Sequence, residues 1–268
     1  MEPCVSTAPT QTQPRRRWDL AGACLAGALL CLAGLRTLSQ REELEPAFRL
    51  AALAALTAAF LTCAAVGWAA CERLPVLDRL GLRPGLAGTA TVLLLALGML
   101  GLSHALDQLI NLLGLRATSQ LAQLDAAMAG APETAWPWML LGLAVAPGIG
   151  EEIFFRGLLQ RGLGRRLGRA GAVVATAAAF GALHGDPVHA AGAFGLGLYL
   201  GTVAELSGGT RAAIACHVLN NLAAVGGMVL PPQQVLPPEA LAVAGLCMAG
   251  LSLDGARRLL RRPALAAR

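Results

Sequence analysis

An acidic pair stands in an otherwise apolar part of the chain, where ionisable side chains are costly and usually functional. Glu151 and Glu152 directly follow a segment with one proline and two glycines at 147–150, which predicts that a helix breaks and restarts there. On the resumed helix, Glu152 and Arg156 are four residues apart in the order that favours an ion pair. Glu151 projects about 100° away, so we expect it to lack a partner and to be available as a general base.

Two further polar groups occur in apolar stretches. His184 lies at the end of the stretch 170–185, and His217 and Asn221 are four residues apart, so they share one face of a later helix. Measured from an arginine-rich turn at 165–169, Glu151 and His184 lie at a similar height of about 25 Å. His217 and Asn221 lie only about 10–16 Å above the turn at 207–210, so helix tilt must absorb the difference. Two neutral donors on one face suit the stabilisation of an oxyanion.

Each group also has a simpler interpretation. A Glu–Arg pair at helical spacing is commonly a solvated ion pair at the end of a span. A histidine at a helix end is commonly interfacial, and an asparagine in a membrane helix often hydrogen-bonds a neighbouring helix. His104, Asp186 and His189 lack spaced partners, so the sequence assigns them no role.

The elements that must position these groups are predicted to be membrane helices. Of the 268 residues, 56% are hydrophobic and only 14% are charged, which is typical of membrane proteins. A helix needs roughly 20 apolar residues to cross a bilayer. Eight stretches without acidic or basic residues approach this length, at 20–35, 50–71, 84–106, 134–150, 170–185, 187–204, 212–238 and 240–253. The predicted fold is all-α, a polytopic membrane helix bundle of about eight transmembrane helices.

The distribution of arginines predicts the orientation, because arginine-rich loops stay in the cytoplasm. With eight spans and both termini cytoplasmic, 17 of the 21 arginines fall inside and four fall outside, at 36, 41, 49 and 116. The inside set includes Arg156. All 21 basic residues are arginine, which is typical of a GC-rich bacterial gene, so we expect location in the bacterial inner (plasma) membrane.

Four regions follow from this pattern. Residues 1–18 are predicted to be a disordered cytoplasmic tail, and residues 19–133 to be variable transmembrane helices ending in an interfacial amphipathic segment at 107–133. Residues 134–256 contain all three polar groups and form the predicted catalytic membrane core. Residues 257–268 form a basic cytoplasmic tail.

The three groups together resemble a known family. The order Glu-Glu-x-x-x-Arg at 151–156, Phe-x-x-x-His at 180–184 and His-x-x-x-Asn at 217–221 is similar to that of the CPBP (CAAX protease and bacteriocin-processing, or Abi) intramembrane proteases. The resemblance covers about residues 134–230.

This resemblance implies an intramembrane glutamic endopeptidase. Glu151 would be the base, His184 its water-binding partner, and His217 with Asn221 the oxyanion site, while Glu152 and Arg156 would support them. It implies no required cofactor. The expected partners are the lipid bilayer and a membrane-associated protein or peptide that carries a sorting signal, leader or CAAX-like end, with no nucleic acid.

Two alternatives stay open. Glu151, Glu152, His184 and His217 are also a possible zinc ligand set, although the chain lacks the His-Glu-x-x-His pattern of zinc proteases. The second alternative is a non-catalytic membrane scaffold or transporter, in which intramembrane Glu and His line a proton or substrate path. The sequence shows no internal repeat of the kind that many transporters have, which argues against a transporter.

Overall fold

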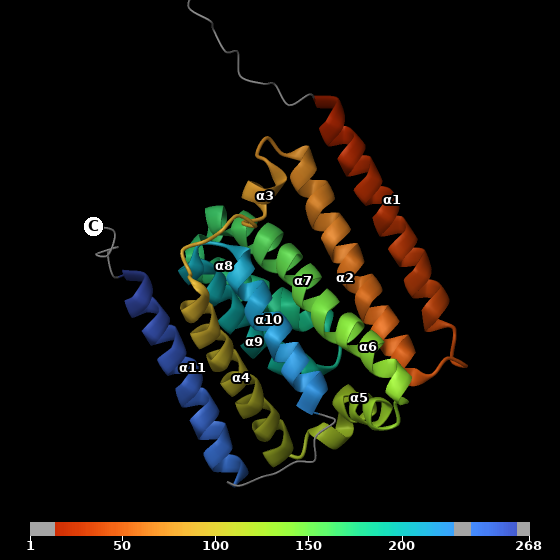
Figure 1. The fold of residues 1–268 in the computed structure, drawn as a ribbon, viewed down its shortest axis with the longest axis vertical. Helices are drawn as coiled ribbons and strands as arrows, with labels where there is room; N and C mark the ends of the chain where they lie inside the picture. Colours follow the sequence, from red (N-terminus) through yellow and green to blue (C-terminus); the bar gives the residue numbers. More distant parts are fainter. Residues whose placement is uncertain (1–13, 228–236, 262–268) are drawn as a thin grey trace, which may run out of the picture.

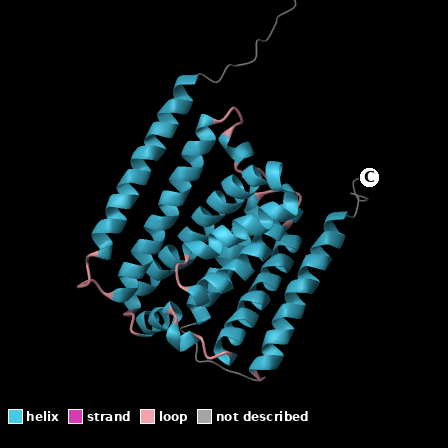
Figure 2. Ribbon diagram, turned by 180° about the vertical axis from the view of Figure 1, so that it is seen from behind, coloured by secondary structure: helices cyan, strands magenta, loops and turns pink. Residues whose placement is uncertain are grey.

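The computed structural model describes residues 14–227 and 237–261, and every regular element in these ranges is a helix (Figures 1 and 2). The predicted all-α fold is therefore confirmed for this part of the chain. Most of the predicted N-terminal tail, the end of the window 212–238 and the end of the basic tail lie outside the described residues. Helix α1 already begins at Pro14, inside the segment predicted as a tail.

Seven helices are long. They are α1 (Pro14–Ser39), α2 (Pro46–Cys71), α4 (Thr89–Leu112), α8 (Arg161–Leu183), α9 (Pro187–Ser207), α10 (Thr210–Gly227) and α11 (Pro238–Arg261). The short helices are α3 (Val76–Arg79), α5 (Gln120–Ala129), α6 (Trp136–Met139) and α7 (Ala146–Glu152). Two 3₁₀ turns, η1 (Arg116–Thr118) and η2 (Glu133–Ala135), and two π-helical stretches, η3 (Leu140–Val145) and η4 (Ile153–Gln160), complete the described elements.

Five helical stretches of the described chain are long and apolar enough to cross a membrane. They are Asp19–Ser39, Pro46–Cys71, Thr89–Leu112, Glu133–Leu183 and Pro238–Arg261. The longest stretch includes two of the predicted windows, 134–150 and nearly all of 170–185, with a bend between them at Gly168, whose backbone takes φ 68°. After this bend the second part of α8 packs back along η4. Helices α9 and α10 fall outside these five, so the number of eight spans stays a prediction.

The outer helices present leucines to the surroundings. Helix α1 packs on α2, and α11 packs on α4, on opposite sides of the molecule (Figure 1). Leu30 of α1 and Leu251 of α11 are each 73% exposed, and Leu25 is 64% exposed. Many large apolar side chains on helices with internally satisfied backbones are typical of contact with lipid. The exposed faces therefore agree with an integral membrane protein.

Small residues let the helices around the acidic pair approach one another closely, as is common in membrane proteins. A Cβ atom on Gly148 would lie 2.6 Å from Cγ2 of Val218 in α10, and one on Gly150 would collide with the carbonyl of Ala58 in α2. Helix α7 is therefore held between α2 and α10, and the residues that follow Gly150 are fixed relative to both.

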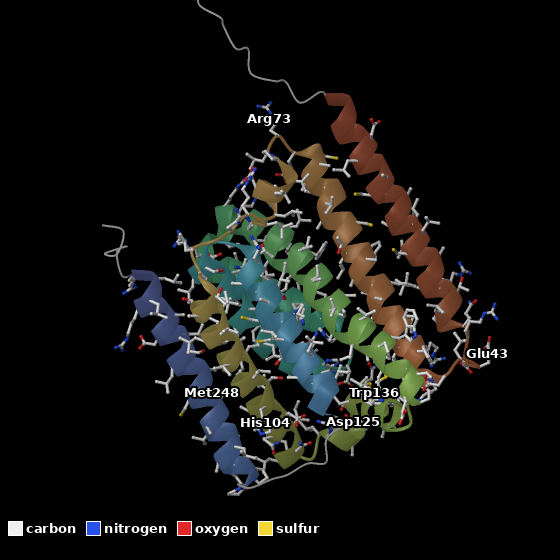
Figure 3. The ribbon with its side chains drawn as sticks, viewed as in Figure 1. Glu43, Arg73, His104, Asp125, Trp136 and Met248 are labelled. Carbon is white, nitrogen blue, oxygen red and sulfur yellow. The ribbon has the colours of Figure 1, made fainter. Side chains whose placement is uncertain are left out.

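The two ends of the bundle differ in composition. Arg73 lies at one end, whereas Glu43, Asp125 and Trp136 lie toward the other (Figure 3). Helix α5, inside the predicted amphipathic segment, carries Asp125 and lies at this second end of the bundle (Figure 1). Its partly buried Leu124 and buried Met128 pack on the cluster that contains Met139.

Candidate active site

The acidic pair lies on a continuous helical segment. The predicted break at 147–150 is wrong, since α7 joins η3 and η4 without interruption and the N–H of Ile153 is used within the helix. The physical reason is the wider π turn of η3, in which the N–H of Ala146 reaches the carbonyl of Leu141, five residues earlier. This turn accommodates Pro147 near the start of α7. Single π turns within α-helices are frequent at functional sites.

Glu152 forms the centre of a fully buried polar network. Its Oε1 accepts a 2.6 Å hydrogen bond from Nη1 of Arg156 and a 2.9 Å bond from Nδ1 of His217. Glu152 and Arg156 are 0% and 1% exposed. The predicted ion pair is present, but the assignment of Arg156 to the cytoplasmic arginines is wrong. It lies inside the fold because its charge is compensated by Glu152, by the carbonyl of Gly197 at 3.0 Å and by the ring of Phe180.

Glu151 faces a different environment from its neighbour. Its side chain is 12% exposed, and the nearest ion-pairing group is Nε2 of His217, 4.0 Å from Oε2 of Glu151. Glu151 also lines a cavity of about 420 Å³. The helix therefore directs the Glu152 carboxylate into the protein interior, where it binds Arg156 and His217, and the Glu151 carboxylate into the cavity.

The two histidines have defined tautomers. Nδ1 of His184 lies 3.0 Å from the carbonyl oxygen of Phe180, which can only accept, so this nitrogen carries the proton. The Glu152 carboxylate accepts a hydrogen bond from Arg156 and can only accept from His217 as well, so Nδ1 of His217 is the donor in their hydrogen bond. The Nε2 edge of each ring is not used in these hydrogen bonds, and both rings line the cavity. Because Glu152 already engages Nδ1 of His217, this ring can donate to an oxyanion only from Nε2.

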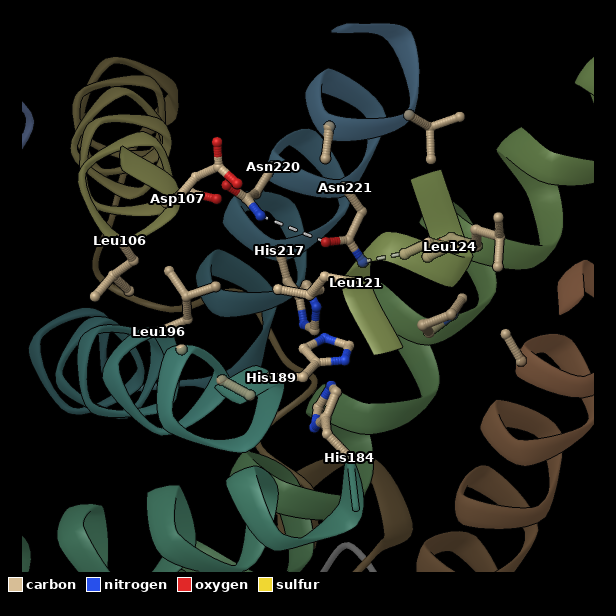
Figure 4. Close-up of a pocket in the computed structure, with 18 of the residues that line it drawn as sticks. Leu106, Asp107, Leu121, Leu124, His184, His189, Leu196, His217, Asn220 and Asn221 are labelled. Carbon is tan, nitrogen blue, oxygen red and sulfur yellow. Dashed lines mark hydrogen bonds between the residues drawn. The ribbon is translucent and has the colours of Figure 1, made fainter. Parts of the chain in front are cut away.

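Asn221 completes the group of predicted residues at the cavity (Figure 4). Its Nδ2 lies 3.5 Å from the carbonyl oxygen of Leu143, and its Oδ1 lies 3.5 Å from Nδ2 of Asn220. Leu143 is four residues before Pro147, which has no N–H to donate to that carbonyl. One N–H of the Asn221 amide is thus directed to the helix that carries Glu151, and the second N–H is available to a ligand.

The turn between α9 and α10, from which the heights of His217 and Asn221 are counted, differs in burial from the bend within α8. This turn is buried, with Ser207 and Thr210 each 1% exposed. Loop residues cover it: the N–H of Leu86 donates to Ser207, and Thr210 donates to the carbonyls of Leu80 and Gly81. Gly168, in the bend within α8, is exposed instead.

The cavity also contains residues that the sequence analysis missed. The ring of His189 lies 4.4 Å from that of His184, and the rings of His217, His189 and His184 follow one another in Figure 4. Asp186 caps α9 by accepting the N–H of His189 at 2.8 Å. The available signal was Asp186-Pro187, a typical helix start, which would have placed His189 in a first turn beside His184.

The open side of the cavity is formed by α4 and α5. Arg116 donates to Asp125 at 2.6 and 2.9 Å and also to Asp107, and all three line the cavity. These carboxylates raise the pKa of Arg116, chiefly through the hydrogen bond to Asp125, and keep it charged.

The alternative zinc ligand set is not assembled as a metal centre. Among the residues that the structure describes, no group of three or more His, Cys, Asp or Glu side chains is arranged to hold a metal ion. Glu152 in particular is turned away from the cavity toward Arg156.

Comparison with known proteins agrees with the resemblance seen in the motifs. Residues 133–223, about a third of the chain, match the family model described as type II CAAX prenyl endopeptidase Rce1-like. This match is consistent with the CPBP family and supports a peptide hydrolase that acts on a membrane-associated protein. No curated protein and no solved structure matches the chain.

Proposed function

We propose that this chain is a glutamic intramembrane endopeptidase. The match of residues 133–223 to the model of Rce1-like type II CAAX prenyl endopeptidases supports this proposal. The observation that carries the proposal is the cavity lined by Glu151, His184 and His217, in which Nε2 of His217 lies 4.0 Å from the Glu151 carboxylate. A carboxylate and neutral imidazoles are groups that can accept a proton from water.

Glu151 acts as the general base in this mechanism. It removes one proton from a water molecule while the second O–H of that water donates to Nε2 of His184. The resulting hydroxide attacks the scissile carbonyl carbon and forms a tetrahedral oxyanion. The protonated Glu151 then gives its proton to the amine as the C–N bond breaks. No covalent intermediate with the protein forms, and the carboxylate is regenerated.

His217 and Asn221 stabilise the oxyanion. Asn221 contributes the amide N–H that is not directed at Leu143. His217 contributes from Nε2 when that nitrogen carries a proton taken up from solvent before the substrate binds, and the hydrogen bond between its Nδ1 and Glu152 holds the ring in place. Donors placed in advance at the developing charge are typically a major part of catalysis. Glu152 and Arg156 hold His217 in position and do not contact the substrate.

The substrate class and location follow the same proposal. We expect a membrane-associated protein or peptide with a C-terminal sorting signal or a leader sequence, cleaved in a bacterial inner membrane with both termini of the enzyme in the cytoplasm. The arginine-only basic composition supports a bacterial source, and that makes a prenylated CAAX end the less favoured substrate.

The test is a comparison of membrane proteomes from cells that carry the unchanged protein, Glu151→Gln or Glu239→Gln. Glu239 is exposed at the start of α11 and lies outside the cavity, so its substitution is a matched control for the loss of one carboxylate. We expect uncleaved precursor peptides to accumulate only with Glu151→Gln. Identical precursor levels in all three strains, with folded protein in each, would reject the proteolytic function.

A further inference from the structure

The two ends of the bundle carry opposite charge. One end, at the arginine-rich turns, holds Arg73, Arg79, Arg83, Arg161, Arg165, Arg166, Arg169, Arg211, Arg257, Arg258 and Arg261. The other end, near α5, holds four arginines, at 36, 41, 49 and 116. Eight acidic residues accompany them, at 42, 43, 45, 107, 125, 133, 186 and 239. Figure 3 shows this separation for Arg73 on one side and Glu43 and Asp125 on the other.

The cavity runs from the protein interior to the arginine-poor end. Its floor is buried, with Met99 and Leu200 each 0% exposed and the His217 side chain 8% exposed. Its rim is open, since the Asp107 and Asp125 side chains are 43% and 36% exposed. No arginine of the opposite end lines it. Access to Glu151 therefore comes from the end of the bundle that is poor in arginine.

The walls between floor and rim are apolar. They include Leu106 and Ile110 of α4, Leu121, Leu124 and Met128 of α5, and Leu196 of α9. Figure 4 shows Leu121 and Leu124 from one side and Leu106 and Leu196 from the other, around the histidines. The Arg116 hydrogen bonds to Asp107 and Asp125 tie α5 to the end of α4, so the two leucine-bearing walls are held together. A channel with such walls binds aliphatic side chains on both sides of a bond presented to its floor.

We propose that the cavity takes an apolar peptide segment presented from the extracytoplasmic side of the membrane. Arginine-rich ends of membrane proteins stay in the cytoplasm, so the arginine-poor mouth faces outward. This inference rests on the proposed function for the cleavage itself, but the orientation of the mouth is independent of it. The substrates are apolar stretches at the outer end of a membrane anchor, and not cytoplasmic C-termini.

A labelling experiment tests the orientation. The variant Thr118→Cys places a thiol at an exposed position beside the mouth, and Ala170→Cys places one at an exposed position of the arginine-rich end. Cells with a permeabilised outer envelope are treated with a membrane-impermeant maleimide, and modification of each introduced cysteine is read by peptide mass spectrometry. The native exposed Cys71, at the arginine-rich end, serves as an internal control in both variants.

We expect the thiol introduced by Thr118→Cys to be modified while the inner membrane is still closed. The thiol introduced by Ala170→Cys should react at least tenfold less until the inner membrane is opened. The reverse pattern would overturn the inference, whatever the protease activity. It would leave the proposed chemistry of Glu151 standing.

A second experiment tests the occupant. Two single-span reporters carry the same leucine-rich segment, one at the outer end of the span and one at the cytoplasmic end. We expect the outer reporter to be cleaved at least tenfold faster, and only when Glu151 is present. Preferential cleavage of the cytoplasmic reporter would overturn the inference. Failure of both, with no difference from Glu151→Gln, would count against the proposed function, while the labelling result still decides the orientation.

A pair of substitutions in α5 tests the apolar wall. Leu121→Asp places a charge on the cavity wall, and Gln123→Asp places the same charge on an exposed position two residues away that does not line the cavity. We expect Leu121→Asp to raise KM for the outer reporter about tenfold or more, with a smaller change in kcat, and Gln123→Asp to leave both unchanged. Equal effects of the two variants would contradict a substrate-binding wall.

Discussion

The same isosteric change, Glu to Gln, is expected to reduce stability at Glu152 and catalysis at its neighbour Glu151. Glu152→Gln removes the charge that compensates Arg156, which is 1% exposed. Loss of one partner of a buried ion pair costs about 3–5 kcal/mol in proteins. The remaining contacts of Arg156, with the carbonyl of Gly197 and the ring of Phe180, carry no negative charge and do not replace the carboxylate. We therefore expect Glu152→Gln to lower the free energy of unfolding by roughly that amount.

Glu151→Gln should leave the stability nearly unchanged. Glu151 makes only a 4.0 Å approach to His217 among the described ion pairs, so the substitution breaks no close contact. Its effect falls on the reaction, because an amide cannot accept the proton of water. Loss of a general base typically lowers the rate by about 10²–10⁴-fold, which corresponds to roughly 3–5 kcal/mol in the activation free energy.

The assay combines thermal unfolding in detergent, followed by tryptophan fluorescence, with cleavage of the outer reporter. For a chain of this size, the loss of about 3–5 kcal/mol predicts a fall in Tm of roughly 6–20 °C for Glu152→Gln. Glu151→Gln should unfold within about 2 °C of the unchanged protein while cleavage is lost. The reasoning fails if the two variants unfold at the same temperature, or if Glu151→Gln still cleaves at more than a tenth of the normal rate.

Three further outcomes are expected. Gly148→Val should lower both stability and activity, because its Cβ would meet Val218 at 2.6 Å and push α7 away from α10; thermal unfolding and reporter cleavage measure this. Tyr199→Phe removes hydrogen bonds that join α9 to α4 and α11, and should cost about 1–2 kcal/mol in equilibrium unfolding without changing KM. The pKa of Asp186 is lowered, chiefly by the hydrogen bond from the N–H of His189. The ionised carboxylate therefore stabilises the folded protein at pH values above the pKa of the unfolded chain, and this stabilisation is lost as the pH falls through the lower pKa of the folded protein. Asp186→Ala should therefore flatten the loss of Tm below about pH 4.

Matched controls separate these effects from general damage. Gly226→Ala lies in α10 with nothing within 4 Å of the added Cβ, so it should leave stability and activity unchanged where Gly148→Val does not. Ser252→Ala should reproduce part of the Tyr199→Phe cost, since the two hydroxyls bond each other at 2.8 Å. A pH profile of Tm for Asp186→Ala identical to that of the unchanged protein would contradict the capping contribution.

The all-helical fold was predictable from the sequence because each helix carries its own signal. Apolar stretches of about membrane length indicate spans. The ion pair of Glu152 and Arg156 follows from their spacing of four residues on one helix, and the structure shows it. The sequence wrongly predicted a helix break at 147–150. Proline usually breaks a helix, but here the preceding π turn lets the helix continue through Pro147.

What the sequence by itself determined is local: the helices, the residue types at Glu151, His184, His217 and Asn221, and the side of each helix on which they lie. The tertiary structure alone decided that these four line one cavity, that Glu152 and not Glu151 holds His217, and that the mouth lies between α4 and α5. The physical reason is that helical periodicity sets direction around one axis. Depth and side-chain partners depend on contacts between distant segments, such as the loop that covers the turn at 207–210 and the hydrogen bond between His217 of α10 and Glu152 of α7.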